Sequence, residues 1–101
     1  MRLSALLLCT LTCAVPAIAA APAPAPGSFG FDWLKPAVAK CVPMTAAALK
    51  ALRSCEYRKE GTFGLSDPAF ACRANAHSEF LVYTSKAVCV NNLETMKANA
   101  P

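Results

Sequence analysis

The 101-residue sequence lacks most of the motifs that mark a catalytic or cofactor-binding protein. It has a single histidine, His77, no Cys-x-x-Cys pair and no glycine-rich phosphate loop. Zinc sites and thioredoxin-like redox centres need closely spaced ligand or cysteine pairs, and phosphate loops need their glycines. We therefore expect neither a metal nor a cofactor.

Charge is also scarce, since only 16% of the residues are charged. The one basic cluster, Arg53, Arg58 and Lys59, is interrupted by Glu56 and Glu60. This alternation is typical of solvated ion pairs rather than of a basic stripe for nucleic acid or a catalytic pair of carboxylates. We expect no nucleic-acid partner.

A long hydrophobic run occurs only at the N-terminus, where it has the design of a secretory signal peptide. Arg2 precedes an apolar run over residues 3–15, Pro16 breaks it, and residues 17–19 are Ala-Ile-Ala. Small side chains at this spacing predict cleavage after Ala19. The run is shorter than the roughly 20 residues of a transmembrane helix, so we expect no stable membrane insertion once it is removed. The mature protein is expected in the periplasm or outside the cell.

A lipoprotein signal is the alternative, because Cys9 and Cys13 lie in this segment. Cleavage before a lipid-modified cysteine requires a small residue in front of it. The preceding residues are Leu8 and Thr12, so we favour a signal peptide that is discarded with both cysteines.

The mature chain is predicted to contain a linker and one small domain. Residues 20–27 are rich in alternating alanine and proline, which favours an extended polyproline II spacer. Residues 28–101 then form a single domain, too short to be comfortably stable on its hydrophobic core alone. With Arg2 removed, nine basic residues face six acidic ones, a net charge of +3.

Four cysteines remain after cleavage: Cys41, Cys55, Cys72 and Cys89. An even number of cysteines in a short exported chain predicts a disulfide framework. Sequential pairing, Cys41 with Cys55 and Cys72 with Cys89, is our preferred connectivity, while the two other pairings stay open.

The fold is expected to be α+β, and its first half is expected to be a helical hairpin. Pro36 suits the first position of a helix over residues 36–41, and Pro43 ends it. Thr45 is a candidate N-cap for a second helix over residues 46–55, with apolar residues at helical spacing.

A β-hairpin and a C-terminal helix are predicted to follow. The strands are residues 70–73 and 79–84, joined by a turn over residues 75–78. The last helix is expected to be capped by Thr84 or Ser85 and to end near residue 98. Its core stripe is expected to consist of Cys89, Leu93 and Met96. The apolar faces of the helices and the strands are expected to meet in one core.

Three aromatic residues at the start of the domain, Phe29, Phe31 and Trp33, are candidates for partner contact, because aromatics often anchor interfaces. The competing interpretation is that they close the base of a small core. We expect a non-enzymatic binding or inhibitor module whose partner is another exported or envelope protein.

A small structural component of the envelope, or a minor enzyme that uses His77, is the alternative. His77 lies in the predicted turn, where an exposed polar residue is ordinary. Catalysis would require a pocket that brings it together with Glu79 or Asp67.

Overall fold

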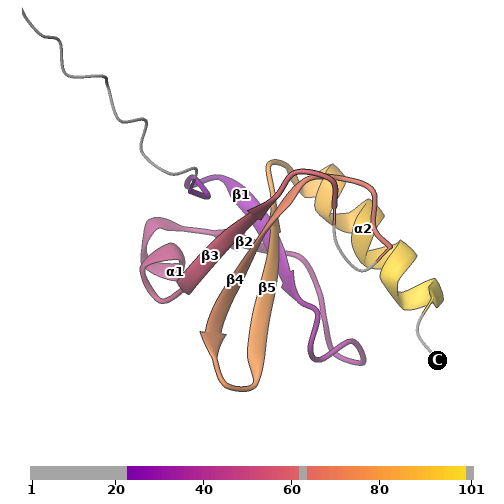
Figure 1. The fold of residues 1–101 in the computed structure, drawn as a ribbon, viewed down its shortest axis with the longest axis horizontal. Coiled ribbons are helices and arrows are strands. Elements are labelled where there is room, and N and C mark those ends of the chain that lie inside the picture. The colour runs from indigo at the N-terminus through magenta and orange to yellow at the C-terminus, as the bar shows by residue number, and fades with distance from the viewer. Residues whose placement is uncertain (1–22, 62–63, 100–101) are drawn as a thin grey trace, which may run out of the picture.

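The computed structural model describes residues 23–61 and 64–99 of the chain. These residues form a five-stranded antiparallel sheet in the order β2-β1-β5-β4-β3, with the longer helix packed on one face (Figure 1). The elements in chain order are β1 (Ser28–Asp32), β2 (Val42–Met44), α1 (Ala46–Lys50), β3 (Arg53–Arg58), β4 (Ala69–Asn75), β5 (Ser78–Tyr83) and α2 (Lys86–Asn99). Strand β5 is central, and β2 and β3 are the two edges.

The predicted signal peptide, residues 1–19, lies outside the described residues, so its cleavage and the domain boundaries stay predictions. The described end of the linker meets the sheet, because the backbone N–H of Gly27 donates to the carbonyl oxygen of Met44 at 3.3 Å. Gly27 has a φ of +96°, a conformation that favours glycine, and it turns the chain into β1.

The predicted helical hairpin is wrong. Residues 36–38 form turns and residues 39–41 have no regular secondary structure, and the second expected helix is only the five residues of α1. Its N-cap is as predicted, since the Thr45 hydroxyl accepts a hydrogen bond from the Ala48 backbone N–H at 3.1 Å. A helix this short has little stability of its own. The expected continuation to Cys55 is instead strand β3, which is stabilised by pairing with β4.

The β-hairpin and the C-terminal helix are present as elements. Strands β4 and β5 pair through a short turn in which the Asn75 side-chain oxygen accepts the His77 backbone N–H at 2.8 Å. Helix α2 is preceded by Ser85, whose hydroxyl accepts the Val88 backbone N–H at 3.2 Å. The fold as a whole is nevertheless mostly an antiparallel sheet.

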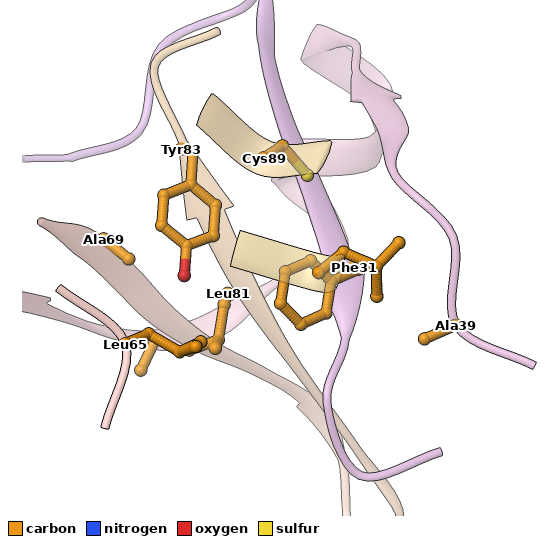
Figure 2. Close-up of a cluster of buried hydrophobic side chains, with 9 residues drawn as sticks. Phe31, Ala39, Leu65, Ala69, Leu81, Tyr83 and Cys89 are labelled. Atoms are coloured by element: carbon orange, nitrogen blue, oxygen red, sulfur yellow. The ribbon is translucent and has the colours of Figure 1, made fainter. Parts of the chain in front are cut away.

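The expectation of one core is also wrong, because the sheet buries apolar side chains on both faces. Alternation along β5 directs Leu81 and Tyr83 toward α2, where they pack with Phe31 and Cys89 (Figure 2). The intervening Val82 joins a smaller cluster on the opposite face, beside α1. The two faces are separate because successive strand residues point to opposite sides.

The expected sequential disulfides are wrong, and one of the open alternatives is found. Cys41 is bonded to Cys89, and Cys55 to Cys72. Because residues 53–58 are a strand beside β4, Cys55 lies directly opposite Cys72 in the sheet. Cys41, at the end of the β1–β2 connection, is thereby left to bond α2.

Candidate binding surface

The most exposed large apolar side chain described lies in the connection between β1 and β2. We call residues 33–41 the β1–β2 loop. Val38 in this loop is 74% exposed and Leu34 is 36% exposed. In the described part of the chain the only other exposed large apolar residue is Tyr57, which is 45% exposed. Because Val38 and Leu34 both lie on this one short loop, the loop is the candidate contact site of the described residues.

The side chain of Asp32, at the end of β1, holds the base of the loop. Its Oδ1 accepts hydrogen bonds from the backbone N–H groups of Leu34 at 3.1 Å and Glu79 at 3.3 Å. Its Oδ2 lies 3.9 Å from Nζ of Lys35, which also donates to the hydroxyl of Ser78 at 3.0 Å. One carboxylate thus links the loop to the neighbouring strand β5.

The middle of the loop is closed by two consecutive turns. The Val38 backbone N–H donates to the carbonyl oxygen of Lys35 at 3.1 Å, and the Ala39 N–H donates to that of Pro36 at 3.4 Å. Pro36 occupies the second position of the first turn, where its restricted φ is already suitable. Val38 is therefore presented on a backbone with few alternative conformations.

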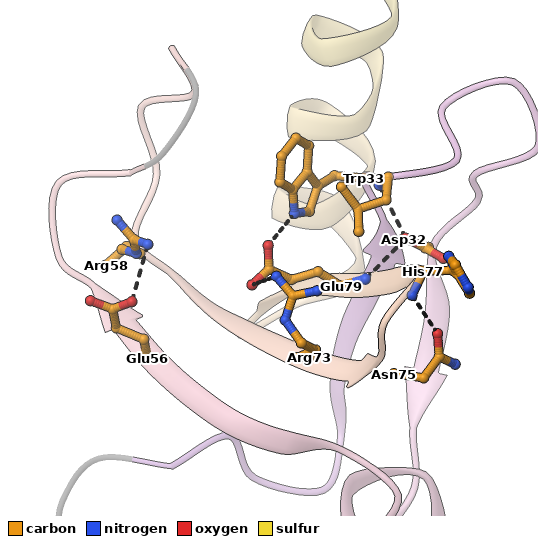
Figure 3. A network of polar contacts seen from close by, with 9 residues as sticks. Asp32, Trp33, Glu56, Arg58, Arg73, Asn75, His77 and Glu79 are labelled. Atoms are coloured by element: carbon orange, nitrogen blue, oxygen red, sulfur yellow. Dashed lines mark hydrogen bonds and ion pairs between the residues drawn. The ribbon is translucent and has the colours of Figure 1, made fainter.

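Both ends of the loop are anchored to other elements. At one end, the Trp33 backbone N–H donates to the carbonyl oxygen of Glu79 at 3.1 Å, and its indole N–H donates to Oε1 of the same residue at 2.8 Å (Figure 3). Arg73 lies 3.8 Å from the other carboxylate oxygen of Glu79. At the far end, the disulfide joins Cys41 to Cys89 on α2. The loop is consequently a constrained segment.

A hollow of about 190 Å³ adjoins the loop. Its apolar lining includes Val38, Val42 and Phe80, and its charged lining consists of Asp32, Lys35 and Lys40. Both lysines are exposed residues. The surface around Val38 thus combines apolar groups with two lysines and one carboxylate, and Asp32 is already paired with Lys35.

The three aromatics proposed for partner contact are anchors of this region. Phe31 is fully buried and stacks on Tyr83 with ring centroids 6.0 Å apart. Phe29 and Trp33 are partly buried and pack against the same cluster. Their contact with a partner stays a prediction, and the burial of Phe31 weighs against it for that ring. The exposed residues next to them, Leu34 and Val38, were not predicted as contact residues from the sequence. Val38 falls in the helix predicted over residues 36–41, although Pro36 is equally suited to the second position of a turn.

The structure does not bring together the residues considered for catalysis. His77 is exposed in the β4–β5 turn. Asp67 precedes the other end of β4, a strand of seven residues that spans roughly 20 Å. Asp67 accepts a hydrogen bond from the side-chain amide of Asn92 at 2.8 Å, while Glu79 is bonded to Trp33.

Tyr83 carries the one marked pKa shift resolved for the described residues. Burial raises the pKa of its phenol to about 12, and the negative charge of Asp67 adds to the shift. Its hydroxyl has no hydrogen-bond partner among the described residues and points into the core. This side chain belongs to the packing of the sheet against α2 and not to a surface site.

No helix within residues 23–61 and 64–99 is long and apolar enough to cross a membrane. In the same residues, no group of three or more His, Cys, Asp or Glu side chains is arranged to hold a metal ion. The two disulfides fit a protein that folds in an oxidising compartment.

The chain matches no protein-family model, no curated protein and no solved structure at a significant level.

Proposed function

We propose that this chain is a non-enzymatic binding module, exported to the periplasm or the cell exterior, that inserts the β1–β2 loop into a pocket on another exported or envelope protein. The observation that carries the proposal is the exposure of Val38 on a loop anchored at both ends. A loop ordered before binding loses little conformational entropy when the complex forms, and this favours affinity.

The composition of the loop indicates the chemistry of the partner. Val38 and Leu34 would occupy an apolar depression, since the buried centre of an interface is depleted of charge. Lys40 lies beside that centre and would face a carboxylate at its rim, whereas Lys35 is held by Asp32 and Ser78 within the chain. Charges at a rim mainly steer association, so the on-rate should fall as salt is raised.

The test is capture of a partner by the oxidised exported protein and by two variants of equal charge. Val38→Asp places a carboxylate at the centre of the proposed contact, whereas Ala87→Asp places one in the first turn of α2, where a negative charge is tolerated or stabilising. We expect the parent and the Ala87 variant to capture the same protein, and the Val38 variant to bind it about 30-fold more weakly, as for a central contact residue.

Binding to the purified partner can be followed through Trp33, the only tryptophan of the chain. Because this indole lies at the base of the loop, insertion of the loop should change its fluorescence. A captured protein that binds both variants equally would place the contact elsewhere and refute the proposed use of the loop. Equal loss of capture in both variants would also refute the proposed use of the loop.

A further inference from the structure

The two edges of the sheet differ in how well they are protected against pairing with another strand. The β2 edge has three residues, and its central residue is Pro43, which has no N–H to donate. The β3 edge has six residues, of which five are exposed. Short strands and prolines are common devices for protecting an edge, so β3 is the more open of the two.

The register of β3 shows which backbone groups face outward. The Cα atoms of the opposed residues Cys55 and Cys72 are 4.0 Å apart. Such a close approach identifies a pair that exchanges no backbone hydrogen bonds, since hydrogen-bonded pairs are about 5.5 Å apart. The backbone N–H and C=O groups of Cys55, and of Tyr57 two residues later, therefore point away from β4.

We propose that a second copy of this chain pairs with this edge, β3 against β3 in antiparallel orientation, so that two sheets join into one. In this dimer each Tyr57 lies opposite the Tyr57 of the second copy, and their outward backbone groups exchange hydrogen bonds. This register places Glu56 opposite Arg58 of the second copy, and Arg58 opposite its Glu56. The edge is thus complementary to itself in charge.

A shift of this register by one or two residues is unfavourable. A shift of one residue would place the outward backbone groups of Tyr57 opposite Glu56 or Arg58, whose backbone groups face β4. A shift of two residues would place Glu56 opposite the Glu56 of the second copy, or Arg58 opposite its Arg58, and like charges directly opposite each other destabilise a strand pair. A shift toward the start of β3 would bring in Ser54, which has a φ of +50° at an irregularity of the β3–β4 pairing. Charge and backbone geometry therefore select the register centred on Tyr57.

The side chains of β3 are suited to this exchange. Glu56 and Arg58 form an ion pair within the chain at 3.1 Å (Figure 3), with side chains 66% and 41% exposed. Exchanging this pair for two pairs between copies requires little desolvation. On the opposite face, Tyr57 contacts Phe70 with ring centroids 5.0 Å apart. The dimer would bring two such aromatic pairs together and cover the exposed part of Tyr57.

This surface is independent of the proposed binding loop. Strands β1 and β2, which carry the loop, lie at the other end of the strand order from β3. A dimer would present two β1–β2 loops, one in each copy, and failure of either proposal leaves the other intact.

The test is sedimentation velocity of the oxidised exported protein over a range of concentrations, using single charge reversals of the proposed contacts. Glu56→Arg leaves two positive charges beside Tyr57, and Arg58→Glu leaves two negative ones. We expect each variant to self-associate at least about tenfold more weakly than the parent, because like charges meet in the pair. A mixture of the two variants should form a heterodimer, since their edges have opposite charge.

The controls are Glu94→Arg and Lys86→Glu, which make the same changes of charge at exposed positions of α2. Both should dimerise like the parent. If Arg58→Glu does not fold, the comparison of Glu56→Arg with its control still decides the question. In the parent, the amides of Cys55 and Tyr57 should become protected from hydrogen exchange as concentration rises.

A parent that stays monomeric at millimolar concentration would overturn the proposal. A dimer that persists in both charge-reversal variants would also overturn the proposal. So would a monomeric protein whose Cys55 and Tyr57 amides become protected from exchange only when an extended segment of another protein is added.

Discussion

Removal of the Cys41–Cys89 disulfide, by replacing both cysteines with alanine, should lower the free energy of unfolding by several kcal/mol. The bridge spans 48 residues, and constraint of the unfolded chain by a loop of that length corresponds to about 4 kcal/mol. The Cys55–Cys72 bridge lies inside this loop and spans 17 residues. With this inner bridge in place, the loop that the Cys41–Cys89 bridge closes is effectively shorter. The contribution of the Cys41–Cys89 bridge to the free energy of unfolding falls only to about 3.7 kcal/mol, because the loop-closure entropy depends on the logarithm of loop length.

The matched comparison is replacement of Cys55 and Cys72 by alanine, for which the same relation gives about 3 kcal/mol. In each bridge one cysteine is fully buried, so the loss of packing is similar in the two variants. The bridge from Cys41 should therefore contribute at least as much as the inner one. A domain of this size has a net stability near the lower end of 5–15 kcal/mol, so either loss should leave it marginal.

Urea titration of the parent and the two double variants, under oxidising conditions, measures these differences. Replacing Cys72 together with Cys89 would not be equivalent, because it breaks both bridges and leaves Cys41 and Cys55 unpaired. A loss below about 1 kcal/mol for the Cys41 and Cys89 pair would refute the reasoning that the longer bridge constrains the unfolded chain.

Three other expectations can be checked separately. Tyr83→Phe should preserve or raise stability at neutral pH, since the hydroxyl has no partner among the described residues. Because the folded-state pKa of Tyr83 is raised to about 12 from 10.0, the parent should lose stability as pH rises from 10 to 12, and the variant should lose less of it; equal alkaline profiles in urea would contradict this. His77→Ala should change the free energy of unfolding by less than about 0.5 kcal/mol, because the side chain is exposed in a turn, and a larger loss would reveal a structural role. N-terminal analysis of the exported protein should find a start near Ala20, and detection of Cys13 in the mature product would refute the signal-peptide assignment.

Features that depend on neighbouring residues were predictable from the sequence. The alternation in residues 79–83 predicted strand β5, and the turn residues before it predicted the hairpin with β4. Apolar spacing predicted helix α2, and Thr45 predicted the start of α1. The pairing of Cys41, Cys55, Cys72 and Cys89 followed from their even number in a short chain that is predicted to be exported. In each case the stabilising contacts are local or are implied by composition.

The tertiary structure decided what depends on distant segments. Leu49, Leu52 and Cys55 have helical spacing, yet Cys55 lies in β3 because pairing with β4 stabilises an extended chain more than a longer helix. That placement in turn decided which cysteines meet. Likewise, Phe31 became core because β1 pairs with β5 under α2, and Val38 became exposed because the loop that returns to β2 turns away from the sheet. The sequence determined disulfide use and the local elements and predicts export, whereas the order of the strands decided the core, the bridges and the exposed surfaces, because these depend on contacts between residues far apart in the chain.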